Sequence, residues 1–201
     1  MREKVLELKN LTMKFGGVTA LDSVDLDVYK GEICALIGPN GAGKTTVFNV
    51  ITGVYQATSG EIVFKGESIL GRKRHHITKF GLARTFQNVR LWGEMTALEN
   101  VITATDVHKR SGLLGALFGL PRMRREEKAD RQRAQELLDF MGIGHRADQL
   151  GKNLPYGDQR RLEIARAMGT NPQLLLLDEP AAGFNPAEKV ELAALIKRIR
   201  D

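Results

Sequence analysis

The stretch "GPNGAGKTT", Gly38 to Thr46, matches the pattern G-x-x-x-x-G-K-[ST] through Gly38, Gly43, Lys44 and Thr45. Glycines in such a loop let successive backbone N–H groups turn inward around a β-phosphate. Lys44 brings a positive charge to the β- and γ-phosphate oxygens, and the Thr45 hydroxyl can bind Mg²⁺. The pattern therefore favours a phosphate-binding loop over a glycine-rich loop without a ligand.

The residues on either side of the loop predict a strand before it and a helix after it. "EICALIG", Glu32 to Gly38, is uninterrupted by polar residues after Glu32, as expected of a strand buried on both faces. A helix is expected from Gly43 to about Thr52. The single cysteine, Cys34, lies in the apolar run, which predicts a buried thiol and excludes an intrachain disulfide.

An acidic pair follows a second apolar run, "LLLLDEP". Asp178 at the end of such a strand can bind Mg²⁺ through water, and Glu179 can polarise a water against the γ-phosphate. Two acids that end a strand are often only a solvated turn. Together with the phosphate-binding loop, however, they predict the metal side of a nucleotide site.

The remaining pattern predicts an α/β fold. Short apolar segments near residues 5–8, 26–28 and 62–64 predict strands, and glycines separate them. From about Phe86 to Met168 the pattern is helical, which predicts a helical subdomain inserted into an α/β core. After the acidic pair a helix is expected near Asn185-Pro186, with Asn as its cap and Pro at its first position.

The stretch "LPYGDQRRLEIARAM", Leu154 to Met168, begins with a Pro-x-Gly turn. A helix that starts there exposes backbone donors and the positive end of its dipole, which suits an anion. The helical pattern places two sets of residues on different faces. One face carries Leu162, Ala165 and Met168, and Arg160, Glu163 and Arg166 point elsewhere.

Charge and hydropathy bound the possible functions. The net charge is +6, but acids interleave with the bases. The densest basic patch, 121–133, is expected to be a solvated helix face, with a docking surface for a partner or for acidic lipid headgroups as the alternative. The run "GLLGALFGL", 112–120, is shorter than the roughly 20 residues of a membrane-spanning helix. The N-terminus lacks the apolar core of a secretory signal, and we expect a cytoplasmic protein.

Two further residues are ambiguous by themselves. Gln87, in "ARTFQNVRLW", would most often be a surface residue, and Phe15, in "MKFGG", would most often be a core aromatic. An aromatic platform for a base contributes roughly 1–3 kcal/mol.

The phosphate loop, the glutamine stretch, the helix "YGDQRRLEIARAM" and "LLLLDEPAAGFNP" occur in the order that resembles the nucleotide-binding subunits of ABC transporters. The resemblance covers essentially the whole chain. It is strongest to the ATPase subunits of branched-chain amino acid importers. It implies a P-loop NTPase core with an N-terminal antiparallel β subdomain, 1–85, a glutamine loop and helical subdomain, 86–168, and an acidic-pair strand with its helix, 169–201.

The resemblance also implies roles for individual residues. Phe15 would stack on adenine, Gln87 would contact Mg²⁺ and the lytic water, Glu179 would be the general base, and Asn185 would lie in a turn that couples two protomers. The residues expected to wrap the phosphates of ATP are Gly38, Pro39, Asn40, Gly41, Ala42, Gly43, Lys44, Thr45 and Thr46. The metal ligands would be Thr45, Gln87 and Asp178.

The implied partners are a second ATPase subunit, integral membrane permease subunits and, indirectly, an external solute-binding protein, with no nucleic acid. The helix that begins near Leu154 would complete the ATP site of the opposite subunit. Closure of the dimer on ATP would pull on the membrane subunits, and hydrolysis would reset it. The chain would then lie on the inner face of the cell membrane.

The signature of the wider family is L-S-G-G-Q, whereas this chain has Pro155, Tyr156, Gly157 and Asp158 after its leucine. The serine hydroxyl is therefore missing, and the Asp158 carboxylate would repel a γ-phosphate. Pro155 is tolerated in a first turn, and the Gly157 N–H can still donate. We expect a site weakened in contacts but intact in shape.

Family members continue into a strand whose histidine contacts the γ-phosphate, but His75, His76, His108 and His145 all precede the acidic pair. We therefore expect a truncated form that binds ATP but turns over poorly.

Two other function classes compete with the importer subunit. A soluble ABC protein acting on ribosomes or DNA would usually carry two nucleotide domains or a long coiled-coil insertion. A P-loop kinase would not explain the helix after Leu154.

Overall fold

The computed structural model describes residues 2–87, 89–105, 107 and 121–201, with the side chains of 121–124 left out. The apolar run 112–120 and His108 lie outside the described residues. Two compact units divide the chain, one formed by residues 1–82 and 190–201 and the other by 83–189. The finer division at residues 85 and 168 stays a prediction.

The first unit is built on an antiparallel sheet. Its strands are β1 (Lys4–Phe15), β2 (Val18–Tyr29), β3 (Ser59–Phe64) and β4 (Glu67–Ser68), in the spatial order β2-β1-β3-β4. Each neighbouring pair is antiparallel. This confirms the predicted N-terminal antiparallel subdomain and its strands.

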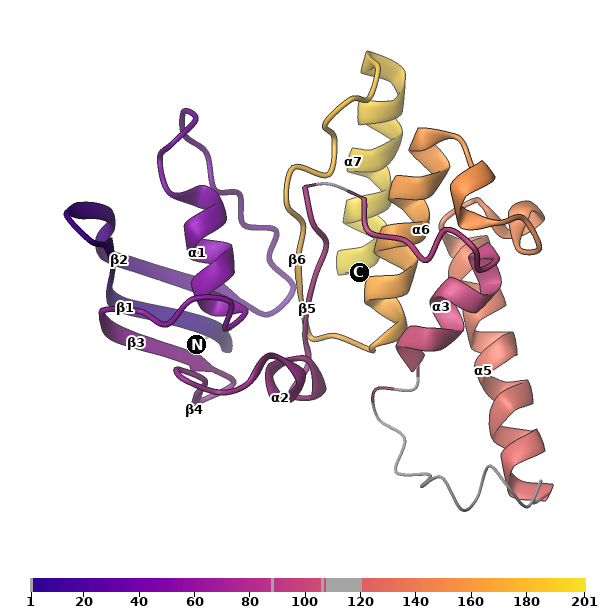
Figure 1. The fold of residues 1–201 in the computed structure, drawn as a ribbon, viewed down its shortest axis with the longest axis horizontal. Helices are drawn as coiled ribbons and strands as arrows, with labels where there is room; N and C mark the ends of the chain where they lie inside the picture. The colour runs from indigo at the N-terminus through magenta and orange to yellow at the C-terminus, as the bar shows by residue number, and fades with distance from the viewer. Residues whose placement is uncertain (1, 88, 106, 108–120) are drawn as a thin grey trace. The chain divides into compact units, whose positions relative to one another are not determined.

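Side chains on one face of this sheet form the core of the first unit. Leu6 pairs with Phe64 and Leu8 with Ile62 across β1 and β3, and all four are buried. Helix α1 (Lys44–Ile51) lies over the sheet (Figure 1) and contacts β2. The short helix α2 (Arg74–Lys79) follows β4. The helix predicted from Gly43 to about Thr52 is confirmed.

The strand predicted before the phosphate loop is wrong. Residues 33–40 have no regular secondary structure, and Ile37 is 93% exposed. Cys34 is also exposed, so the predicted buried thiol is wrong. An apolar run becomes a buried strand only where a neighbouring strand supplies hydrogen bonds, and the four-stranded sheet ends at β2 and β4 without including it.

The second unit contains most of the helices and a two-stranded sheet. Strands β5 (Leu82–Arg84) and β6 (Leu174–Leu176) lie side by side. Helix α3 (Ala97–Thr105) packs on α5 (Pro121–Phe140) and on α6 (Tyr156–Gly169), and α5 packs on α6 (Figure 1). Two 3₁₀ turns, η2 (Gly144–Arg146) and η3 (Gly151–Asn153), join α5 to α6. Helix α7 (Pro186–Arg200) follows the acidic pair, and its residues from Val190 onward belong to the first unit. The helical subdomain is confirmed.

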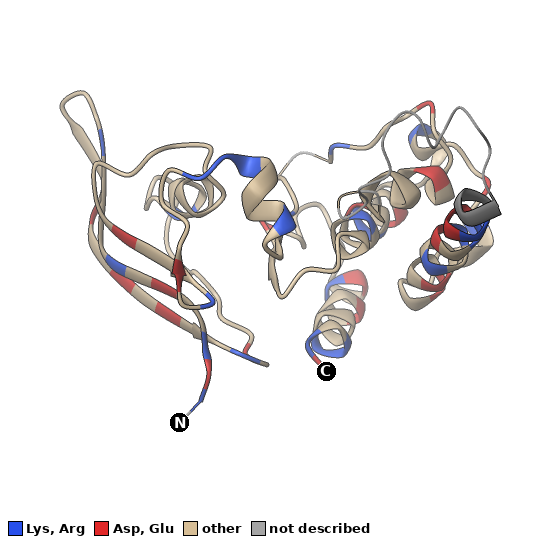
Figure 2. Cartoon of the chain, turned by 90° about the horizontal axis from the view of Figure 1, so that it is seen from below, with Lys and Arg blue, Asp and Glu red and all other residues tan. Residues whose placement is uncertain are grey.

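Basic and acidic residues are both spread over the strands and helices of each unit (Figure 2). On α5 the described side chains from 125 to 133 are exposed or half-buried, which fits both a solvated helix face and a docking surface, so the choice between them stays open. None of the described helices has the length and hydropathy needed to span a membrane.

Candidate functional site

The loop before α1 has the backbone shape that its glycines predict. Gly41 and Gly43 have φ angles of +83° and +85°, a region that L side chains rarely adopt. The Ala42 N–H donates to the Pro39 carbonyl at 3.2 Å, which closes the loop, and Gly43 is the N-cap of α1. The helix thus starts directly at Lys44.

Gly43 is also required by its neighbours. A Cβ atom there would lie 2.7 Å from the Ala20 carbonyl oxygen and 2.9 Å from Leu21 Cδ2. A Cβ at Gly41 would meet nothing within 4 Å. Close packing against β2 therefore requires glycine at position 43, whereas only the backbone conformation favours glycine at position 41.

The loop fits a phosphate group. The Lys44 ammonium donates to the carbonyl oxygens of Gly38 at 2.7 Å and Pro39 at 2.8 Å, so its charge lies over the loop. The first turn of α1 holds no acidic residue. A helix N-terminus and an ammonium without a nearby carboxylate in that turn favour an anion. Thr45 beside them is exposed.

Phe15 lies at the end of β1 and is 42% exposed, which argues against its interpretation as a core aromatic. Its ring meets that of Tyr55 edge to face, with centroids 5.1 Å apart. Stacking of adenine on Phe15 stays a prediction.

The predicted metal ligand Asp178 forms a buried ion pair. Its Oδ2 accepts a hydrogen bond from Arg84 Nη2 at 2.8 Å, and the two side chains are 7% and 6% exposed. The Asp178 N–H donates to the Thr85 hydroxyl at 3.3 Å, and the Thr85 N–H donates to the Leu176 carbonyl at 2.9 Å. Residues at the end of β5 therefore hold the carboxylate.

The other two proposed catalytic residues of this unit contact each other. Gln87 Nε2 donates to Glu179 Oε2 at 3.2 Å, and both residues are exposed. Glu179 has a φ angle of +46°, a strained conformation that costs about 1–3 kcal/mol for a residue other than glycine.

Helix α6 begins as its sequence predicts. Pro155 is the N-cap with φ −54°, and its carbonyl accepts from the Gln159 N–H at 2.9 Å. Asp158 forms an ion pair with Arg146 at 2.6 Å. The charge that would repel a γ-phosphate is therefore partly neutralised inside the same unit.

Two buried residues of α6 were not anticipated from the sequence. Arg160 and Glu163 were expected to point away from the apolar face, but their side chains are 3% and 2% exposed and pair at 3.1 Å. A salt bridge of opposite charges three residues apart can lie inside a protein as well as on its surface. Both residues lie in "RRLEIARA", 160–167, where charged and apolar residues are equally frequent, and nothing in that stretch indicates that these two are buried.

The predicted cap of α7 is confirmed. Asn185 Oδ1 accepts from the Glu188 N–H at 3.0 Å, and Glu188 Oε2 accepts from the Asn185 N–H at 2.8 Å, which together form a capping box. A Cβ at Gly157 would lie 3.7 Å from Glu188 Oε1. The start of α6 thus lies beside the start of α7.

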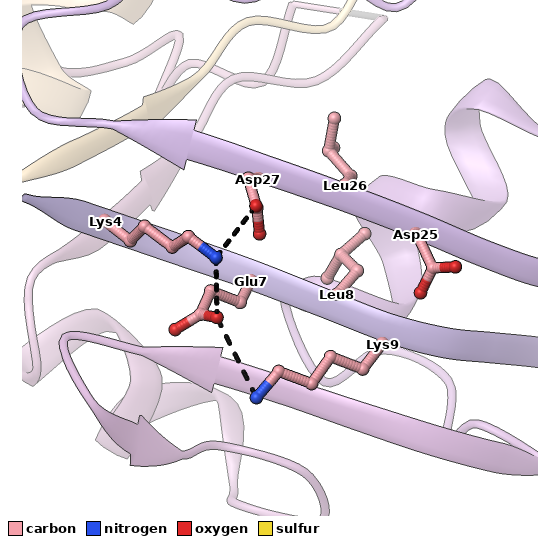
Figure 3. A pocket seen from close by; sticks show the side chains of 7 residues that line it. All are labelled: Lys4, Glu7, Leu8, Lys9, Asp25, Leu26 and Asp27. Atoms are coloured by element: carbon pink, nitrogen blue, oxygen red, sulfur yellow. Dashed lines mark hydrogen bonds and ion pairs between the residues drawn. The ribbon is translucent and has the colours of Figure 1, made fainter. Parts of the chain in front are cut away.

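A hollow on the sheet holds none of the predicted site residues. Figure 3 shows Lys4 between Glu7 and Asp27, at 3.2 Å and 2.9 Å, with Lys9 at 3.8 Å from Glu7. The pKa of Lys4 is raised because it donates hydrogen bonds to Asp27 and Glu7. The hollow is lined by Lys4, Glu7, Leu8, Lys9, Asp25, Leu26 and Asp27. Its charges compensate one another.

The predicted residues fall in both units. Phe15 and the loop 38–46 belong to the first unit, and Gln87, the start of α6 and the acidic pair belong to the second. The second group is linked by the contacts of Gln87 with Glu179 and of α6 with the turn after Glu179.

Comparisons with known proteins identify the family of the chain. A family model described as ABC transporter matches residues 21–182. The chain is 48% identical over 200 residues to the high-affinity branched-chain amino acid transport ATP-binding protein BraF of Pseudomonas aeruginosa, covering 100% of this chain and 78% of that protein. It is 46% identical over 201 residues to LivG of Escherichia coli, described in the same words, covering 100% and 79%.

Solved structures match as well. An ATP-binding cassette of an ABC transporter in its ADP conformation superposes with a TM-score of 0.82 at 31% identity, covering 98% of this chain and 77% of that one. A dimeric cassette in a post-hydrolysis state, bound to ADP and Pi, gives a TM-score of 0.80 at 28% identity, covering 98% and 83%. The chain belongs to the ABC transporter family, as one of its ATP-binding subunits.

Proposed function

We propose that this chain binds and hydrolyses ATP to energise a membrane importer for branched-chain or other hydrophobic amino acids. The observation that carries the proposal is the phosphate loop, whose left-handed glycines and overlying Lys44 ammonium, at the start of α1, would suit an anion. Similarity over the full chain to two branched-chain amino acid transport ATP-binding proteins supports the substrate class.

ATP would bind with adenine on Phe15 and its phosphates along residues 38–46. Among the described residues, no three His, Cys, Asp or Glu side chains gather to hold a metal ion by themselves. Mg²⁺ is usually held by one or two carboxylates and by substrate phosphates. The family resemblance assigns the remaining ligands to Thr45, Gln87 and Asp178. Bound Mg²⁺ would neutralise charge that develops on the phosphates.

Glu179 would act as general base toward the attacking water, with Gln87 beside it. Their hydrogen bond supports a joint role, because it orients the carboxylate through the side-chain amide of a residue 92 positions away in the sequence. Asp178 would share its carboxylate between Mg²⁺ and Arg84.

The site would be completed by a second ATPase subunit, identical or paralogous. Gly157 and the N-terminus of α6 would contact ATP bound to the other chain. Permease subunits would dock on the helical region 86–168, and an external binding protein would deliver the solute. The chain would lie in the cytoplasm, peripherally on the inner face of the membrane.

A bulky residue at Gly157 tests this arrangement. Gly157→Leu should abolish ATP-driven dimerisation, measured by light scattering, and leave ATP binding to the monomer nearly unchanged. Gly17→Leu is the matched control, since a Cβ there meets nothing within 4 Å. Loss of monomer binding in Gly157→Leu would count against a ligand in the opposite chain.

The low turnover expected of this 201-residue chain also stays a prediction, and its steady-state ATPase rate tests it.

The alternative is an ATPase acting on ribosomes or DNA. Affinity purification from cells should recover the chain with integral membrane permease subunits. Co-sedimentation with ribosomes, without a permease, would replace the importer assignment.

A further inference from the structure

Helix α6 carries two opposite charges into the interior of the second unit. The side chains of Arg160 and Glu163 are 3% and 2% exposed, and their charged atoms pair at 3.1 Å. A buried ion pair contributes little net stability compared with well-packed apolar residues, because both charges lose their hydration. What such a pair provides is a fixed set of hydrogen-bonding directions.

The two side chains direct these hydrogen bonds to the backbone of residues 86 and 87, in the glutamine loop. Glu163 Oε1 accepts from the Phe86 N–H at 3.1 Å, and Arg160 Nη1 donates to the Phe86 carbonyl at 2.8 Å. Arg160 Nη2 donates to the carbonyl of Gln87 itself. Both polar backbone groups of Phe86 and the carbonyl of Gln87 are therefore held by α6.

The same guanidinium reaches the turn after the acidic pair through Tyr156. Arg160 Nε donates to the Tyr156 hydroxyl at 3.1 Å, and that hydroxyl donates to the Ala182 carbonyl at 3.1 Å. A Cβ at Gly183, where φ is +79°, would lie 3.0 Å from Tyr156 Cε1. The tyrosine ring thus lies directly against this turn.

We propose that Tyr156, Arg160 and Glu163 are positioning residues. They connect helix α6, through hydrogen bonds, to the glutamine loop and to the turn after Glu179. Through them, engagement of the α6 N-terminus by nucleotide sets the placement of Gln87 in the same chain. The inference rests on the proposed ATPase function. It gives Tyr156, which replaces a glycine of the wider family signature, a role inside its own chain, separate from any contact with ATP.

Tyr156→Phe removes only the hydroxyl, and Tyr156 is 46% exposed, so the variant should fold. We expect kcat for ATP hydrolysis to fall about tenfold, the change equivalent to one hydrogen bond of about 1.4 kcal/mol. KM and ATP binding to the monomer should stay unchanged. Tyr29→Phe, at the end of β2, is the matched control and should keep the wild-type kcat.

Arg160→Lys provides a second variant. Lysine keeps the charge but cannot donate in the three directions that Nε, Nη1 and Nη2 use here. We expect the same selective loss of kcat as in Tyr156→Phe. Full activity in Arg160→Lys, or equal losses in kcat and ATP binding in both variants, would overturn the positioning role.

Amide hydrogen exchange tests these contacts between α6 and the glutamine loop without measuring ATPase activity. In the nucleotide-free protein the Phe86 amide should exchange several-fold faster in Tyr156→Phe and Arg160→Lys than in the wild type, while amides of β1 should not change. Unchanged exchange at Phe86 in both variants would overturn the inference. A wild-type protein that hydrolyses no ATP in any subunit combination would overturn the proposed function instead. The exchange result would still decide whether α6 positions the glutamine loop.

Discussion

The side-chain amide of Gln87 donates to the carboxylate of Glu179 at 3.2 Å, across 92 residues of sequence. Two residues proposed to handle the attacking water therefore touch each other within one unit. The contact makes their contributions dependent on each other, which mutation can measure.

Glu179→Gln should lower kcat by roughly 10²–10⁴-fold, the usual contribution of a general base, and leave ATP binding intact. Gln87→Ala should add little in the Glu179→Gln background, because residues in contact are not additive. Steady-state ATPase rates of the wild type, the two single variants and the double variant give the coupling free energy between the two residues. Glu61→Gln, an exposed carboxylate on β3, is the control. Additive losses would show that Gln87 acts apart from Glu179.

Gly43→Ala should destabilise the fold more than Gly41→Ala. Both positions have left-handed φ angles, which cost an alanine roughly 1–2 kcal/mol. Only at Gly43 would the new Cβ overlap the Ala20 carbonyl. Urea denaturation would measure the free energy of unfolding of each variant. Equal values would mean that the loop moves away from β2 without cost.

Asn100→Ala should lower the free energy of unfolding by at least about 2 kcal/mol, since it leaves buried backbone groups unsatisfied. Asn100 is fully buried, accepts from the Trp92 N–H at 2.9 Å and donates to the carbonyls of Trp92, Met95 and Thr96. Asn153→Ala, at an exposed position, should change it by less than about 0.5 kcal/mol. Comparable losses in the two variants would contradict this anchoring of residues 92–96.

Glu99 should make the fold more stable at neutral pH than at acidic pH. Its pKa lies below the usual 4.5 because its carboxylate accepts from the Thr96 backbone N–H and hydroxyl, at 2.8 Å and 3.0 Å. A lowered pKa in the folded state stabilises above the unfolded pKa, and the effect is lost as pH falls through the folded value.

The test compares the wild type with Glu99→Gln by denaturation across pH. The wild type should be the more stable at neutral pH, and the difference should shrink below pH 4.5. Thr96→Val, which removes one donor, should reduce the pH-dependent part. A difference that stays constant with pH would contradict the role of the charge.

Features set by local chemistry could be predicted from the sequence. The glycines and Lys44 predict a loop and a helix start, and Asn185-Pro186 predicts a cap, because neighbours along the chain satisfy the backbone groups there. Pro155 at the start of α6 is the same kind of feature.

Features that depend on distant partners could not be predicted. The run around Cys34 has the composition of a buried strand, but a strand forms only beside another strand's edge. Arg160 and Glu163 have the spacing of a surface pair, and their burial depends on the Phe86 backbone, more than seventy residues earlier. The partner of Asp178, Arg84, lies 94 residues earlier in the sequence.

The ion pair of Arg84 with Asp178 has a consequence for the catalytic cycle. A buried carboxylate without a countercharge is costly, so a site that relied on a divalent cation alone would lose stability whenever the cation left. Arg84 is a permanent countercharge of the chain itself. In the proposed cycle, nucleotide and Mg²⁺ would then leave together after each turnover without unfolding the site, and chelation of Mg²⁺ should leave the melting temperature of the nucleotide-free protein unchanged.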